Sequence, residues 1–153
     1  MGKWEDPGPG GYYDDIGNIY KSPHVVKLHA PDTDPLFTIT DNPGFDWWES
    51  GYHRARLSWM SSMGWPILEY PNLDPEASYS LRLSGVGDAF PLVDGQELKP
   101  TQYSKETGKI KIFPIPKELT RKGHISIRFR EIDESHLNWR LHSRLNEAWL
   151  VRD

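Results

Sequence analysis

Short stretches in which apolar and polar residues alternate recur along this chain. The clearest is ASYSLRLS (77–84), where Tyr79, Leu81 and Leu83 share one face of an extended strand and polar residues share the other. A second is GHISIRFRE (123–131), whose two isoleucines and phenylalanine alternate with serine and arginine. Alternation with a period of two predicts β-strands that bury one face.

Weaker versions of this pattern fill most of the remaining sequence. They predict strands at 24–29, 52–60, 67–70, 90–98, 109–113 and 147–152. The Asp94-Gly95 pair inside 90–98 is typical of a tight hairpin, and PKELTRK (116–122) predicts one helical turn. Because 13 glycines and 13 prolines separate the runs, the sequence predicts an all-β fold. The expected architecture is an antiparallel β-sandwich of the jelly-roll type with roughly eight strands.

The chain has the length of one domain, 153 residues. We expect residues 11–153 to form this domain and residues 1–10 (MGKWEDPGPG) to be a linker-like segment at a domain boundary. These first residues contain no apolar signal core, and no stretch reaches the about 18 consecutive apolar residues of a membrane helix. The sequence therefore predicts a soluble domain with no membrane partner, and any export signal would lie outside it.

Composition excludes several classes of function. Without cysteine there is no disulfide framework, thiolate catalysis or cysteine-ligated zinc site. The net charge is −4, with 18 basic and 22 acidic residues intermixed along the chain. Such a mixture offers no continuous positive surface for a phosphate backbone, which argues against nucleic acid as a partner.

The stretch FDWWESGYHRARLSWMSSMGW (45–65) contains four of the seven tryptophans. The alternation in 52–60 places Leu57 and Trp59 on the inward face, so we expect Trp59 to belong to the core. Trp149, between alanine and leucine in the last predicted strand, is likewise expected to be a packing residue.

Four other tryptophans lie in predicted loops. Trp47 and Trp48 are adjacent and bracketed by turn residues, so both cannot point into the core of an extended segment. Trp65 in MGWP and Trp139 in LNWR have similar settings. An exposed indole suits the C–H face of a pyranose ring, which makes these four candidate sugar platforms. The alternative is that they only cover the open end of the sandwich.

Sugar hydroxyls need both hydrogen-bond donors and acceptors beside a stacking ring. The candidates for this role are Tyr13, Arg56, Asn138 and Arg140, with Asp14, Asp15, Asn18, Arg144 and Asn146 as further polar groups. The alternative for each is ordinary surface solvation or a salt bridge.

Catalytic motifs are missing from the sequence. The six histidines occur singly, and no nucleophile elbow, phosphate loop, dinucleotide fingerprint or EF-hand spacing is present. A glycosidase with paired carboxylates stays open, because the separation that matters, about 5 to 9 Å, is spatial.

Several segments resemble galactose-binding-like β-sandwiches, a group that includes malectin-like and carbohydrate-binding modules. They are NLDPEASYSLRLSG (72–85), DPGPGGYYDDIGN (6–18), PHVV (23–26), RLSWM (56–60) and NEAWLV (146–151). These segments are similar to accessory modules of large bacterial polysaccharide-degrading proteins. The resemblance implies a sandwich whose chain ends lie together. It also implies a structural calcium ion where the N-terminal segment meets the last strand, held by Asp14 or Asp15 with Glu147.

Together these observations favour a non-catalytic carbohydrate-binding accessory module. It would be a monomer that binds a plant or microbial polysaccharide and holds an attached catalytic domain near it, as part of an exported, extracellular or periplasmic protein. One alternative is a structural or protein-docking domain without a ligand of its own. Another is a small polysaccharide lyase or glycoside hydrolase.

Overall fold

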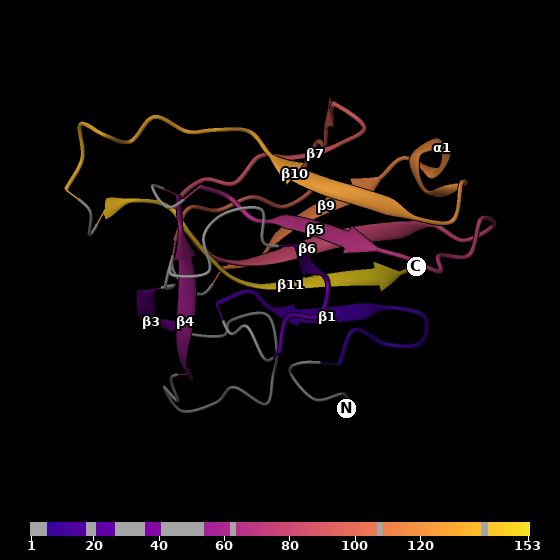
Figure 1. Cartoon of the computed structure of the whole chain (residues 1–153), viewed down its shortest axis with the longest axis horizontal. Coiled ribbons are helices and arrows are strands. Elements are labelled where there is room, and N and C mark those ends of the chain that lie inside the picture. The colour runs from indigo at the N-terminus through magenta and orange to yellow at the C-terminus, as the bar shows by residue number, and fades with distance from the viewer. Residues whose placement is uncertain are drawn as a thin grey trace.

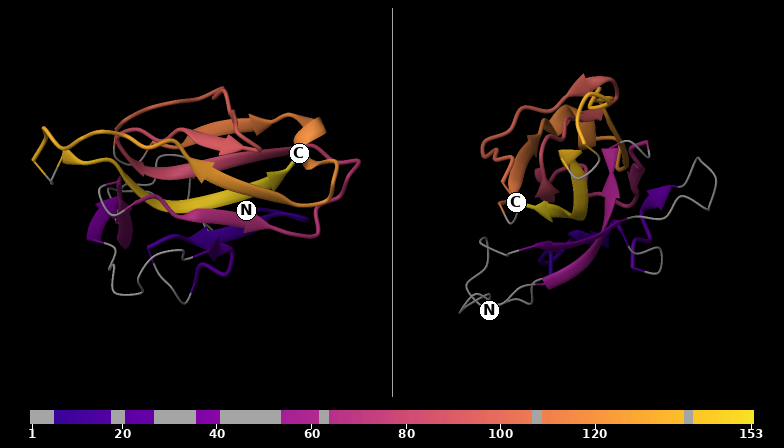
Figure 2. Two further views of the ribbon diagram at one scale, coloured as in Figure 1. Left: turned by 45° about the horizontal axis from the view of Figure 1, so that its top comes forward. Right: turned by 90° about the vertical axis from the view of Figure 1, so that its left-hand side faces the viewer.

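The fold is that of two antiparallel β-sheets packed as a sandwich (Figures 1 and 2). The computed structural model describes residues 6–17, 21–26, 36–40, 54–61, 64–106, 109–138 and 141–153, with backbone alone for 36–40 and 54–58. One sheet has the order β3 (Leu36–Thr40), β4 (Arg54–Met60), β11 (Arg144–Arg152), β6 (Tyr79–Val86) and β9 (Lys111–Ile115), with β1 (Tyr12–Asp15) also paired to β11. The other has the order β2 (Val25–Val26), β5 (Ile67–Tyr70), β10 (Ile125–Phe129), β7 (Pro91–Val93) and β8 (Gln96–Glu97).

The predicted all-β sandwich is confirmed. The strand at 67–70 has the predicted bounds, and the Asp94-Gly95 hairpin joins β7 to β8. Both hairpin residues have positive φ, 52° and 78°, as the favoured two-residue turn requires. The predicted helical turn is α1 (Lys117–Thr120), and no helix of the described ranges is long and apolar enough to cross a membrane.

The described residues form eleven strands, more than the roughly eight expected. β1 and β3 were not predicted: YYDD has no alternation of apolar and polar residues, and LFTIT alternates only in its FTIT part, a very short run. Within the predicted strand at 24–29, β2 is Val25–Val26, and residues 27–29 lie outside the described part of the chain. Such short strands are stable because they are hydrogen-bonded to a neighbouring strand. The sequence of the short segment alone does not show which strand that is.

The core lies between the sheets and includes the inward faces of the two clearest predicted strands. Tyr79, Leu81 and Leu83 of β6 are buried, as are the three apolar residues of β10. Trp59 belongs to this core, as predicted. Trp149 is buried too, but it packs with Ile110 in a second, smaller cluster.

Strand β11 has partners along both edges. β6 pairs along its whole length on one edge, with an irregularity between Leu145 and Glu147. β4 pairs with its first residues, and β1 pairs with Glu147 to Leu150. The N-terminal segment therefore lies beside the last strand, as the resemblance implies.

We expect Ile127→Ala to lower the free energy of unfolding by about 2–5 kcal/mol, because it removes a fully buried side chain between β5 and β7. Its exposed neighbour Arg128 provides the matched control, and Arg128→Ala is expected to change that free energy by less than about 0.5 kcal/mol. Urea unfolding followed by tryptophan fluorescence measures both. Equal effects of the two variants would contradict this assignment of the core.

Candidate functional site

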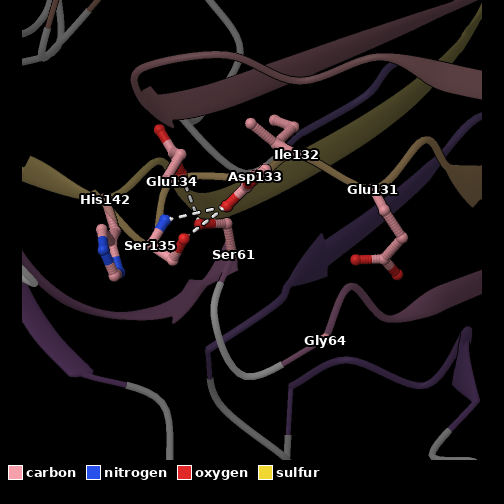
Figure 3. A pocket seen from close by; sticks show the side chains of 8 residues that line it. All are labelled: Ser61, Gly64, Glu131, Ile132, Asp133, Glu134, Ser135 and His142. Atoms are coloured by element: carbon pink, nitrogen blue, oxygen red, sulfur yellow. Dashed lines mark hydrogen bonds between the residues drawn. The ribbon is translucent and has the colours of Figure 1, made fainter. Parts of the chain in front are cut away.

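A surface cleft of about 360 Å³ lies where the connection between β10 and β11 meets the end of β4. In Figure 1 this connection extends from the end of the sandwich opposite α1. The residues that line the cleft are Ser61, Gly64, Glu131, Ile132, Asp133, Glu134, Ser135 and His142. Figure 3 shows their side chains, with Glu131 and His142 at opposite sides of the view.

Glu134 connects the β10–β11 connection by hydrogen bonds to the residue after β4 and to the residue before β11. Its Oε1 accepts hydrogen bonds from the Ser61 hydroxyl and, at 2.8 Å, from the Ser143 backbone N–H. Its Oε2 accepts a bond of 2.9 Å from the Ser143 hydroxyl. Burial raises the pKa of Glu134, but the bonds from Ser61 and Ser143 and the nearby His142 outweigh it, so the pKa is lowered overall. The carboxylate is therefore held in its ionised form.

Asp133 is a second anionic group on the cleft. The hydroxyl and backbone N–H of Ser135 both donate to its Oδ1, at 2.7 and 3.1 Å. These bonds lower the pKa of Asp133, the hydroxyl bond most. Asp133 therefore presents a carboxylate acceptor to solvent.

His142 is the most buried titratable side chain of the cleft, with an exposed fraction of 9%. Its Nε2 lies 3.2 Å from the carbonyl oxygen of Leu137. Because a carbonyl only accepts, Nε2 carries a proton in this contact. Nδ1 is buried and has no hydrogen-bond partner.

The structure corrects one of the predicted sugar platforms. Trp65 was expected on an exposed loop, but only 7% of it is accessible and its ring packs 5.7 Å from that of Phe129. The prediction was wrong because Trp65 lies just before β5 and packs inward with that strand. Its indole offers no open face to a sugar.

The other predicted sugar-binding residues fall into two groups. Trp47, Trp48, Trp139 and Arg140 lie outside the described residues, as does the side chain of Arg56. Asn138 is exposed and belongs to the connection that forms the cleft. Tyr13 does not line the cleft, because its hydroxyl donates to Glu147 at 2.6 Å and its ring packs on Trp149.

The structure brings together two of the three residues predicted to bind calcium. Asp15 lies directly opposite Glu147 in the pairing of β1 with β11. Glu147 is fully buried and accepts hydrogen bonds from Tyr13 and Ser84. Asp14 points to the other face of the strand, since neighbours alternate. The described part of the chain contains no group of three or more acidic or histidine side chains suited to a metal ion, and calcium binding stays a prediction.

Asp14 instead joins β1 to the opposite sheet. Its carboxylate accepts a 2.9 Å bond from the backbone N–H of His24 and lies 2.9 Å from Nδ1 of the same residue. The ring of His24 is 4.5 Å from Tyr12 and 5.0 Å from Tyr70. Burial raises the pKa of Asp14, opposed by its contacts with His24, and burial beside Asp14 raises that of the Tyr70 hydroxyl. This cluster is enclosed, so we assign it a structural role.

A buried lysine forms another cluster that the sequence did not predict. Lys111 is only 3% exposed, and its Nζ lies 5.1 Å from the centre of the Tyr103 ring. Tyr103 donates a 2.7 Å hydrogen bond to Asp88. Burial lowers the pKa of Lys111 to about 8, against the opposing effect of Asp88.

We expect Glu134→Gln to destabilise the fold by about 1–3 kcal/mol at pH 7. The glutamine NH2 group would replace one carboxylate oxygen, so it would face the hydroxyl of Ser61 or of Ser143, which now donates to that oxygen. Since the pKa of Glu134 is below its ordinary value of 4.5, its ionised form stabilises the fold above that pH. This contribution is lost as the pH falls through the folded-state pKa. Urea unfolding at pH 7 and pH 3 should give a smaller difference from wild type at pH 3.

Glu131→Gln, at an exposed position on the same cleft, is the matched control and is expected to change stability by less than about 0.5 kcal/mol. A pH-independent effect of Glu134→Gln would contradict this role of the ionised carboxylate.

Lys111→Met tests the buried ammonium group. In wild type, the lowered pKa means that the unfolded chain binds more protons than the folded one between about pH 8 and 10.5. This group therefore makes the fold more stable as the pH rises through that window, by up to the order of 3 kcal/mol. We expect the methionine variant to lack this rise. Exposed Lys109→Met is the control, and chemical unfolding at pH 7.5 and pH 10 is the measurement.

Comparison with known proteins assigns no family to this chain. Neither family models, nor curated proteins, nor solved structures give a match. The likeness to galactose-binding-like modules therefore rests on the sequence segments quoted above.

Proposed function

We propose that this protein is a non-catalytic carbohydrate-binding module that holds a polysaccharide in the cleft beside the β10–β11 connection. The observation that carries the proposal is an open cleft whose lining consists mainly of carboxylates, hydroxyls and an imidazole. Sugar hydroxyls are recognised by such side chains at the surface of a rigid scaffold.

The sequence of the connection supports the same site. Asn138, Trp139 and Arg140 lie in the chain between Ser135 and His142, and both of these line the cleft. An indole, a guanidinium and an amide are the groups expected of a sugar subsite, where the ring stacks and the polar groups fix orientation. Three of the predicted sugar-binding residues are thus close in sequence to the cleft.

The ionisation of the cleft carboxylates favours binding over catalysis. A glycosidase requires a general acid that stays protonated near neutral pH, which means a raised carboxyl pKa. The pKa values of Asp133 and Glu134 are both lowered. These two groups therefore suit the acceptor role better than that of an acid catalyst.

A docking surface has less support. Such a surface would present a patch of apolar side chains without hydrogen-bonding groups around it. Among the described residues, the only large apolar side chain that is exposed is Leu141, at 65%. Single exposed apolar residues are ordinary in soluble proteins.

In this proposal the module is part of an exported polysaccharide-degrading protein. Binding would raise the effective concentration of an attached catalytic domain at its substrate, so a modest affinity is enough. The module itself would need no cofactor for this role.

Retention on polysaccharides tests the proposal. Wild type, Trp139→Ala and Asp133→Ala would be compared by pull-down on insoluble polymers and by affinity gel electrophoresis on soluble ones. Glu118→Ala, in α1 at the other end of the sandwich, is the control. We expect at least one polymer to retain wild type and the control, with a roughly tenfold or larger loss for Trp139→Ala, as stacking contacts often give.

Thermal unfolding of each variant shows whether the fold is intact. Retention abolished only by Trp47→Ala or Trp48→Ala would keep sugar binding but overturn the placement in this cleft. No retention on any polymer would overturn the function itself.

A further inference from the structure

We infer that the loop between β6 and β7, residues 87–90, positions Glu134 from outside the cleft and thereby sets the affinity of the cleft for its ligand. Gly87, Asp88 and Tyr103 are the positioning residues, although none of the three lines the cleft. The control of affinity rests on the proposed function, whereas the position of Glu134 can be measured in the free protein.

Ser143 connects this loop to Glu134. Its hydroxyl donates a 2.9 Å hydrogen bond to Oε2 of Glu134 and accepts one of 2.8 Å from the backbone N–H of Asp88. Ser143 is only 1% exposed, so water does not compete for these bonds. A hydroxyl that accepts one hydrogen bond donates the other more strongly. The loop therefore sets both the direction and the strength of the bond from Ser143 to the carboxylate.

Gly87 brings the backbone of the loop directly against Ser143. A Cβ atom at this glycine would lie 2.3 Å from the Ser143 hydroxyl oxygen and 2.9 Å from the Cα and Cβ of Ser143. The φ of Gly87 is 80°, a conformation that residues with a side chain rarely adopt. Both the conformation and the available space require glycine at this position.

Tyr103 and Lys105 anchor the other side of the loop. The Tyr103 hydroxyl donates to Oδ1 of Asp88 at 2.7 Å and accepts from the backbone N–H of Ala89 at 3.2 Å. The backbone N–H of Gly87 donates to the carbonyl oxygen of Lys105 at 2.8 Å, and the Lys105 ammonium lies 3.2 Å from Oδ2 of Asp88. Burial and the bond to Asp88 raise the pKa of Tyr103, so its hydroxyl keeps its proton and remains a donor. The loop is therefore held on both sides.

The pKa of Glu134 depends on this arrangement. Burial raises that pKa, and the bonds from Ser61 and then from Ser143 together outweigh the effect of burial. If the loop moves, the Ser143 hydroxyl loses the direction that Asp88 gives it, and its bond to Glu134 weakens. The pKa of Glu134 should then rise toward its ordinary value of 4.5.

Gly87→Ala is the first test. We expect the added Cβ to displace Ser143 and to raise the pKa of Glu134 by about 0.5, measured by NMR from the carboxyl carbon resonance as a function of pH. Gly95→Ala is the matched control, because Gly95 has a φ of 78° but no described atom within 4 Å of an added Cβ. It should carry the same backbone strain and leave the pKa of Glu134 unchanged. Equal shifts in the two variants would overturn the role of Gly87.

Tyr103→Phe tests the anchor and decides the matter even if the first glycine variant does not fold. The exchange changes no charge, so its effect on the pKa of Glu134 has to pass through the hydrogen bonds. We expect a rise of about 0.3 that disappears in the background of Ser143→Ala. Tyr79→Phe is the matched control, since the hydroxyl of Tyr79 also accepts a backbone hydrogen bond, at 2.8 Å, from a residue far from the cleft.

Affinity gel electrophoresis on a soluble β-glucan, a xylan and a galactomannan relates the positioning to binding. We expect Gly87→Ala to weaken retention by the polymer that retains wild type about tenfold, as the loss of a hydrogen bond to a charged group does. Tyr103→Phe should weaken it less, and both control variants should be retained like wild type.

The outcomes separate the positioning of Glu134 from the proposed function. A wild-type pKa of Glu134 in both Gly87→Ala and Tyr103→Phe would overturn the positioning, as would a shift in Tyr103→Phe that persists without the Ser143 hydroxyl. Shifted pKa values with unchanged retention would overturn the control of affinity while keeping sugar binding. If no polymer retains wild type, the proposed function fails together with the control of affinity, and the pKa values still decide the positioning.

Discussion

Antiparallel pairing along β11 is the constraint on which the rest of the structure depends. The strand is hydrogen-bonded to β6 on one edge and to β4 and β1 on the other. Because both edges are occupied, the backbone groups of a long buried strand are satisfied without water. The same pairing fixes where β4 ends and where the β10–β11 connection returns to the sheet. The position of the cleft follows from these two points.

The strands that could be predicted from the sequence are those that bury one face. In β6 and β10 the inward residues are the apolar ones, so alternation alone identifies them. Alternation does not say whether the polar face is also covered, and Ser80 and Ser84 turn out to be buried. In β9 the pairing of Lys111 with Leu83 turns the lysine toward the core, while Ile112 lies on the other face opposite Arg82. The register of pairing decides which side chains of such a strand are buried, and that register depends on the neighbouring strand.

The candidate site, like the strands, could be predicted from the sequence only in part. Asn138 was a candidate from the sequence and lies in the connection that forms the cleft. The resemblance implied that Asp14 or Asp15 meets Glu147, and β1 and β11 bring only Asp15 opposite it. The sequence could not predict that Trp65 turns inward, because a tryptophan in a loop beside proline has the same local pattern whether buried or exposed. Nor could it find the role of Glu134, whose partners Ser61 and Ser143 are 73 and 9 positions away in the chain. Long-range contacts of this kind leave no periodic signal in the sequence.

The hydrogen bonds of Glu134 also bear on how the cleft meets a ligand. They join the β10–β11 connection to the end of β4 and, through Ser143 and the backbone of Asp88, to the loop that follows β6. Three separate segments are thereby set in place before any ligand arrives. A preorganised surface loses little conformational entropy on association, so each contact contributes more of its energy to affinity. A small cleft with few contacts can in this way discriminate between molecules that differ by a single group.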